Sequence, residues 1–167
     1  MSGHVFVVGA DLTRLSCDDV LVPTDRTLRV APGWSPLFPP DLVTERSADG
    51  ACVDLRWTGG ERVLEVPGEG RRRIWLVDTV ATGEEPGEDG GLSWLLSGAR
   101  EALAAVARRE VAEPAHGRAR RLVGLPALGT GWGGAAGRRG ALLQRLLPVL
   151  REAAADHGFD VALVLRG

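Results

Sequence analysis

The segment from Arg121 to Gly137, RLVGLPALGTGWGGAAG, constrains the fold of this 167-residue chain more than any other. It begins with a short apolar strand, continues into a loop rich in glycine, and leads directly into a leucine-rich helix. A strand, a glycine loop and a helix N-terminus in this order can surround an anion with backbone N–H groups, and a Cβ at the glycines would block that approach. The sequence therefore predicts a phosphate-binding loop in an α/β fold.

Two common phosphate-binding motifs do not fit this loop. No Lys-Ser or Lys-Thr pair follows it, as a Walker loop requires. The dinucleotide fingerprint lies at the first strand–helix turn of a Rossmann unit, whereas here only one helix and one strand follow the glycines. The loop is therefore of neither type.

Composition narrows the class of protein. A length of 167 residues, 44% hydrophobic and 25% charged, predicts a single folded domain spanning 1–167. The formal net charge of −2 does not favour nucleic acid as a partner. No apolar N-terminal segment or long apolar run occurs, so we expect a cytoplasmic protein that is neither secreted nor membrane-bound. Cys17 and Cys52 lie far apart and the three histidines are isolated, so we expect reduced thiols and no metal site.

Hydrophobic periodicity predicts alternating strands and helices. Two apolar stripes predict helices, at 92–111 and at 140–157, and His157-Gly158 is typical of a helix C-terminal cap. Alternating patterns at 51–57 and 61–66 predict a β-hairpin with its turn at 58–60. The proline-rich segment 31–41 cannot hold a long helix. Compact apolar runs predict buried strands at 4–8, 73–80 and 159–165, and further strands at 19–23 and 122–125.

Polar residues at the ends of two strands are candidates for ligand binding, because open α/β folds bind ligands at the carboxyl ends of their strands. Asp11 follows the first strand, and Asp25 and Arg26 follow the second. Either aspartate can instead accept hydrogen bonds from its own turn, and Arg26 can be a solvated side chain. The sequence leaves both interpretations open.

Three segments together resemble the macro domain, a module that binds ADP-ribose. Segment 9–13 (GADLT) is similar to the family's Gly-Asp-Ile-Thr turn after strand one. Segment 18–28 (DDVLVPTDRTL) is similar to its Asp-Ala-Ile-Val-Asn-Ala-Ala-Asn segment, and 125–134 (LPALGTGWGG) closely follows its Phe-Pro-Ala-Leu-Gly-Thr-Gly diphosphate loop. The resemblance implies a three-layer α/β/α fold with a mixed central sheet, no cofactor, and ADP-ribose or another NAD-derived nucleotide as ligand.

The resemblance also implies roles for individual residues. Asp11 would accept a hydrogen bond from the adenine amino group, assisted by the backbone of Leu12. Asp25 takes the place of an asparagine that contacts the distal ribose in catalytic members, and Arg166 would stack on adenine. Trp132 would lie over the distal ribose. The diphosphate and distal ribose would be held by Gly129, Thr130, Gly131, Trp132, Gly133 and Gly134.

Departures from the family pattern leave three functions open. The glycine run that follows Leu28 in the family is replaced by 29–34 (RVAPGW), and Asp25 stands where the catalytic asparagine would be. The leading prediction is a non-catalytic binder of ADP-ribose. The alternatives are an ADP-ribosyl hydrolase in which Asp25 orients a water, and a degenerate macro-like fold that acts through protein contacts. Expected partners are the nucleotide, an ADP-ribosylated protein, or an NAD-consuming, sirtuin-like domain fused to or associated with the chain.

Overall fold

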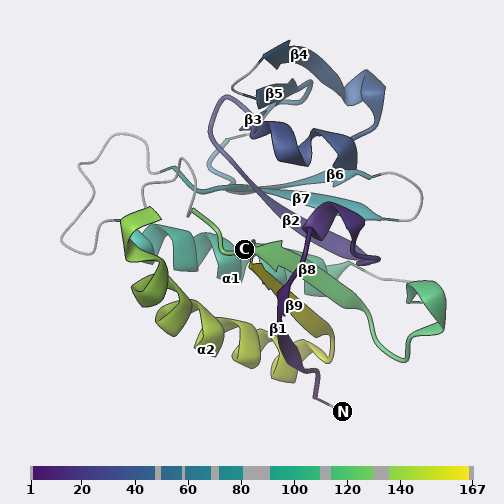
Figure 1. The fold of residues 1–167 in the computed structure, drawn as a ribbon, viewed down its shortest axis with the longest axis vertical. Helices are drawn as coiled ribbons and strands as arrows, with labels where there is room; N and C mark the ends of the chain where they lie inside the picture. Colours follow the sequence, from purple (N-terminus) through teal and green to yellow (C-terminus); the bar gives the residue numbers. More distant parts are fainter. Residues whose placement is uncertain are drawn as a thin grey trace.

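The computed structural model describes residues 2–47, 50–57, 59–68, 72–80, 91–109, 114–129 and 136–165. Its centre is a six-stranded sheet, with the strands in the order β1-β9-β8-β2-β7-β6 (Figure 1). Neighbouring strands are parallel throughout, except that β6 runs antiparallel to β7. The strands are β1 (Val5–Gly9), β2 (Asp19–Thr24), β6 (Val63–Pro67), β7 (Arg73–Asp78), β8 (Leu122–Pro126) and β9 (Asp160–Leu165).

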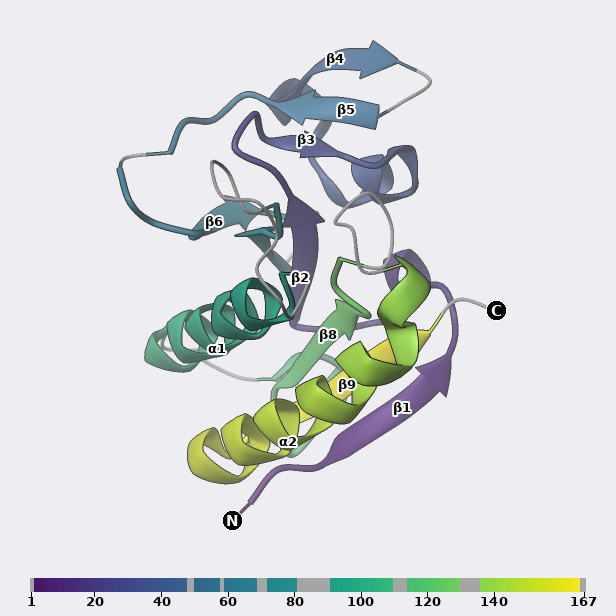
Figure 2. The same cartoon turned by 90° about the vertical axis from the view of Figure 1, so that its left-hand side faces the viewer.

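Two α-helices cover one face of this sheet (Figure 2). They are α1 (Leu92–Arg108) and α2 (Arg139–His157), and both lie close to the limits that periodicity predicts. Seven apolar residues of α1 are buried because their helical spacing places them on one face: Leu92, Leu95, Leu96, Ala99, Ala102, Leu103 and Val106. Leu92 and Leu95 form a small cluster with Leu142 of α2, and the other five belong to the core that α1 and α2 form with the sheet. The predicted cap of α2 is confirmed, since Gly158 has a φ of 70° and donates to the carbonyl of Ala154.

Short 3-10 helices and a small second sheet cover the other face (Figure 1). The three-stranded sheet has the order β3-β5-β4, with β3 (Arg29–Val30), β4 (Val43–Ser47) and β5 (Gly50–Val53). The proline-rich segment forms 3-10 helices η2 (Pro32–Leu37) and η3 (Pro40–Leu42), as expected for a stretch unable to form a long helix. The predicted three-layer α/β/α class with a mixed sheet is therefore confirmed. The layer opposite α1 and α2 consists of 3-10 helices and the small sheet.

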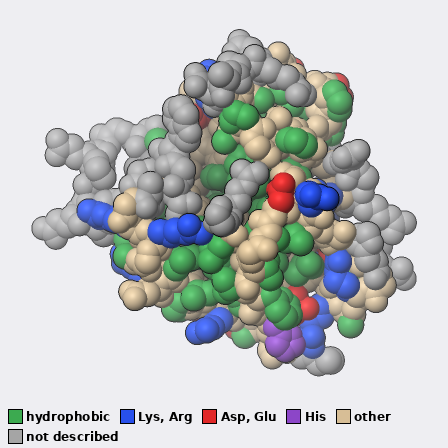
Figure 3. Space-filling model, viewed as in Figure 1, with side chains coloured by type: hydrophobic (Ala, Val, Ile, Leu, Met, Phe, Trp, Pro, Cys, Tyr) green, Lys and Arg blue, Asp and Glu red, His purple; other side chains and the backbone are tan. Residues whose placement is uncertain are grey.

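The first predicted strand is present but is not buried. The side chains of Phe6 and Val7 are 48% and 54% exposed, because β1 forms an edge of the sheet and has β9 on one side only. Figure 3 shows hydrophobic side chains on the face of the molecule where this strand lies. An apolar run does not indicate whether its strand lies in the middle or at the edge of a sheet. The prediction that this strand is buried was wrong for that reason.

The predicted hairpin of 51–57 with 61–66 is also wrong. Strand β5 ends at Val53 and pairs with β3 and β4 in the small sheet, whereas β6 pairs with β7 in the large one. In the observed pairing Val66 faces Ile74 across the ladder. Both residues are fully buried there, so this pairing removes their apolar side chains from water. In the part of the chain described, no helix is both long and apolar enough to cross a lipid bilayer.

Candidate functional site

The carboxyl ends of β1, β2, β7, β8 and β9 meet at one edge of the large sheet, because all five strands run in the same direction. Asp11, Asp25 and Gly129 each follow one of these strands, so the fold brings these predicted site residues to one edge. Six other predicted residues lie outside the described residues: Thr130, Gly131, Trp132, Gly133, Gly134 and Arg166.

Asp11 begins the 3-10 helix η1 (Leu12–Arg14) directly after β1. Its Oδ1 accepts hydrogen bonds from the Thr13 N–H at 3.0 Å and from the Thr13 hydroxyl at 2.8 Å. The aspartate therefore caps its own turn, as one of the two interpretations expected. The same bonds fix the direction of its carboxylate at the edge of the sheet.

The Asp11 turn is held against β8 by a glycine. Leu12 is 2% exposed, so its side chain belongs to the core and only its backbone is available to a ligand. A Cβ at Gly124 would lie 2.7 Å from Leu12 Cδ1 and 2.6 Å from Cys17 Sγ. Because no side chain fits there, Gly124 allows η1 to pack closely on the sheet. Burial raises the pKa of the Cys17 thiol to about 11.

Asp25 organises the turn after β2. Its Oδ1 accepts from the Thr27 N–H at 2.8 Å, the Thr27 hydroxyl at 2.6 Å and the Arg29 N–H at 3.2 Å. Leu28 closes this turn with a φ of 58°, unusual for a bulky residue, and donates to the Asp25 carbonyl. Among the described residues, Oδ2 of Asp25 has no hydrogen-bond partner. One oxygen of this carboxylate is thus structural.

Arg26 does not extend into solvent but is tied to three neighbours. Its Nε lies 2.8 Å from Oδ2 of Asp78, and its Nη1 donates to the Glu61 carbonyl at 2.8 Å. The guanidinium lies 5.0 Å from the centre of the Trp57 ring, a cation–π contact. Arg26 therefore joins the end of β2 to β7 and to the segment before β6. The interpretation of Arg26 as a solvated side chain, one of the two that the sequence left open, is wrong.

Asp78 is a further candidate residue, which the sequence patterns did not indicate. It ends β7 at the same edge and is fully buried. Burial raises the pKa of its carboxyl, and the Val80 N–H, Arg26 and Arg62 only partly oppose this rise. The available signal was its position, since it is an acidic residue at the carboxyl end of an apolar run, like Asp25.

Arg62 is a second missed residue, buried beside the start of α1. Its guanidinium lies 3.6 Å from the centre of the Trp94 ring and donates to the Trp94 carbonyl and, at 2.9 Å, to the Ser97 hydroxyl. A Cβ at Gly98 would lie 2.9 Å from its Nη2, so this glycine in the helix leaves room for the cation. Burial lowers the pKa of Arg62, although Glu101 and Asp78 oppose this.

The entrance to the glycine-rich segment is pressed against α1. Ala127 and Leu128 are buried after β8, and Gly129 has a φ of 75°. A Cβ at Gly129 would lie 2.6 Å from Leu95 Cδ1. Both the left-handed backbone and the close contact require glycine, so the start of this loop is fixed between the sheet and the helix.

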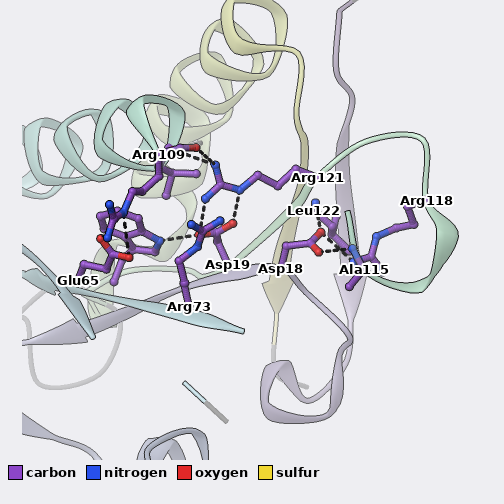
Figure 4. A network of polar contacts seen from close by, with 11 residues as sticks. Asp18, Asp19, Glu65, Arg73, Arg109, Ala115, Arg118, Arg121 and Leu122 are labelled. Carbon is purple, nitrogen blue, oxygen red and sulfur yellow. Dashed lines mark hydrogen bonds and ion pairs between the residues drawn. The ribbon is translucent and has the colours of Figure 1, made fainter. Parts of the chain in front are cut away.

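The amino ends of the strands, opposite to the candidate site, carry a structural ion-pair network (Figure 4). Asp19 is fully buried and binds Arg121 through both carboxylate oxygens and the Trp75 Nε1–H at 2.7 Å. Asp18 accepts from Arg118 and from two backbone N–H groups. These carboxylates are satisfied by the protein itself, which leaves the carboxyl edge as the candidate site. Within the described ranges, no group of three His, Cys, Asp or Glu side chains could hold a metal ion.

Comparison with known proteins identifies the fold. No family model matches the sequence. No curated protein matches it either. Among solved structures, the chain is similar to a mutant of the Oceanobacillus iheyensis macrodomain, with a TM-score of 0.57 and 14% identity over 98% of this chain and 84% of that one. It is also similar to an alphavirus P23pro-zbd, with a TM-score of 0.61 and 18% identity over 98% of this chain. It spans only 22% of that longer chain. The protein therefore has a macrodomain fold, divergent in sequence.

Proposed function

We propose that this protein is a binding module for ADP-ribose or a related NAD-derived nucleotide, which occupies the carboxyl edge of the large sheet. The observation that carries the proposal is the convergence of Asp11, Asp25 and Gly129 at that edge, in a macrodomain fold. Open α/β sheets bind ligands at this place. The backbone constraint at Gly129 supports a loop that comes close to a diphosphate.

Asp11 would recognise the adenine, and the segment 129–134 would hold the diphosphate and distal ribose. The Thr13 bonds orient the Asp11 carboxylate before a ligand arrives, which lowers the entropic cost of binding. The charge at Asp25 would oppose a nearby phosphate, and the ion pair of Arg26 with Asp78 keeps that cation from neutralising it. We therefore expect the adenine side of the site and the segment 129–134 to hold the nucleotide, and the turn at Asp25 to add little affinity for its phosphates.

The bonding of Asp25 favours a binder over a hydrolase. A general base must reach a water with a free oxygen in a suitable direction. Three bonds to Oδ1 fix the Asp25 carboxylate in its own turn, so the unpartnered Oδ2 cannot turn freely toward a water, and the asparagine of catalytic macro domains is absent. An ADP-ribosylated protein, or an NAD-consuming domain fused to or associated with the chain, would then be the partner.

Isothermal titration calorimetry with ADP-ribose, NAD and ADP tests the proposal. We expect micromolar binding of ADP-ribose that is lost in Asp11→Ala and in Gly131→Glu. The matched control is Asp41→Ala, which removes an exposed carboxylate from η3 and should leave binding unchanged. Circular dichroism checks that each variant is folded, because loss of the Asp11 cap costs about 0.5–2 kcal/mol. Absence of heat with all three nucleotides, from folded wild-type protein, would refute the proposal.

A further inference from the structure

Strand β1 leaves one row of its backbone groups without a partner. It pairs with β9 on one side, where the His4 carbonyl accepts from the Val161 N–H at 2.8 Å. Successive residues of a strand point their N–H and C=O groups to opposite sides. The N–H and C=O groups of Val5, Val7 and Gly9 therefore point away from the sheet. Within the described residues, none of these three has a hydrogen bond on that side.

Strand β1 also lacks the features that prevent an edge strand from pairing with a strand of another molecule. Natural edge strands are protected by charged side chains, proline, bulges or covering segments. The sequence of β1, VFVVG, has no charge and no proline, and its pairing with β9 has no bulge. Its two central side chains, Phe6 and Val7, are about half exposed, on opposite faces of the sheet. The strand is therefore suited to pair with another strand.

The other edge of the sheet is protected. The Asp78 N–H donates to the Arg62 carbonyl, so alternation points the backbone of Glu65 and Pro67 outward from β6. Pro67 has no N–H to donate, and the Glu65 carboxylate is paired with Arg109 at 2.8 Å. Addition of β1 from one molecule to β6 of another would lose a hydrogen bond at Pro67. Such head-to-tail addition would also build open filaments rather than a closed assembly.

We propose that β1 is the interface with a second copy of this chain, paired antiparallel about a two-fold axis at Val7. In this register Val7 faces Val7 of the partner subunit, and Val5 faces Gly9 of the partner subunit. All outward-pointing groups then form bonded pairs, and each of the three pairs exchanges two hydrogen bonds. A shift of two residues either way leaves only two such pairs. No charged side chain of β1 meets another across the axis, so pairing costs no repulsion.

The exposed side chains gain cover in the same register. Val5 packs with the helical side of the sheet and Val8 with the opposite side, so Phe6 lies on the side of Val8. Phe6 would then lie directly opposite Val8 of the partner subunit, in a pair without mutual hydrogen bonds, and the two Val7 side chains would meet at the axis. The candidate nucleotide sites would face opposite directions and both would stay open. A five-residue edge buries less than a standard interface, so we expect a dimer with a dissociation constant of roughly micromolar order.

Sedimentation velocity on the whole chain over a range of concentrations tests this inference. We expect wild-type protein to shift from monomer to dimer, and Val7→Lys and Val7→Glu each to remain monomeric through like-charge repulsion at the axis. Val80→Lys is the matched control, since Val80 is also exposed but lies just beyond the end of β7, and it should dimerise normally. Circular dichroism verifies folding of each variant.

A mixture of the two Val7 variants tests the register itself. Only a pairing in which position 7 faces position 7 brings lysine against glutamate, so an equimolar mixture should recover the dimer. Wild-type protein that stays monomeric at submillimolar concentration would overturn the proposal. So would a dimer that both Val7 variants still form, which would place the interface elsewhere.

Discussion

Removing the Arg121 side chain should destabilise this protein far more than removing an exposed arginine. Arg121 is 10% exposed and binds the fully buried Asp19 through two nitrogens (Figure 4). Its Nη1 also donates to the Val106 carbonyl at 2.6 Å and the Arg109 carbonyl at 3.2 Å, at the C-terminal end of α1. One guanidinium thus joins the amino end of β2, the start of β8 and the end of the helix.

The expected loss for Arg121→Ala follows from these contacts. Removing one partner of a buried ion pair costs about 3–5 kcal/mol, because the other charge stays buried without compensation. Asp19 keeps the Trp75 hydrogen bond and an ion pair with Arg73 at 3.4 Å, which places the loss at the lower end, near about 3 kcal/mol. Total stabilities of folded domains are only about 5–15 kcal/mol. The variant should therefore be folded but marginal.

Urea unfolding followed by circular dichroism measures this loss. The control is Arg109→Ala, whose pair with Glu65 is 59% and 29% exposed and should contribute about 0–1 kcal/mol. In a double-mutant cycle, Asp19→Ala combined with Arg121→Ala should cost clearly less than the sum of the single changes, because both charges leave together. If Arg121→Ala cost no more than Arg109→Ala, the guanidinium would be solvated and our reasoning about the network would be refuted.

Three further predictions concern other parts of the molecule. Gly124→Ala should cost about 1–3 kcal/mol in urea unfolding by overpacking, and should weaken ADP-ribose binding in calorimetry because it displaces the Asp11 turn; unchanged binding would contradict this. Burial opposes ionisation of Asp18, but bonds from the N–H groups of Leu122 and Ala115 and from Arg118 outweigh it and lower its pKa below the ordinary 3.8. The stability that Asp18 contributes is therefore present above pH 3.8 and lost as the pH falls through its lower folded value, so acid unfolding curves of the wild type should fall more steeply there than those of Asp18→Asn. At pH 8 a thiol reagent should modify Cys52 well before Cys17, whose pKa of about 11 and burial both slow reaction, and equal rates would count against the packing around Gly124.

Local residue patterns anticipated the positions of Asp11 and Asp25, but not the contacts that Arg26 and Asp78 make. Asp11 and Asp25 were expected at strand ends, and the turn bonds that each makes are local bonds within four residues. The contact between Arg26 and Asp78 joins residues that are far apart in the sequence. No local pattern encodes such a pair, so neither the raised pKa of Asp78 nor the binding of Arg26 could be derived beforehand.

The elements whose signals are local could be derived from residue patterns alone. The spacing of leucines and alanines specifies α1, and Gly158 ends α2. Continuous apolar runs specify β2, β8 and β9, because parallel strands in the middle of a sheet are covered on both faces. These signals depend on a few neighbouring residues, and the surrounding fold does not alter them.

Which strands are neighbours depends on how the whole chain packs. It placed β1 at the edge, with Phe6 and Val7 exposed, although its sequence is as apolar as that of the central strands. It paired β6 with β7 rather than with β5. It also brought Arg62 against Trp94 and Gly98. Strand pairing and buried cation contacts depend on the free energy of the whole packed chain, since each is formed between residues distant in sequence, and that is why local periodicity does not reveal them.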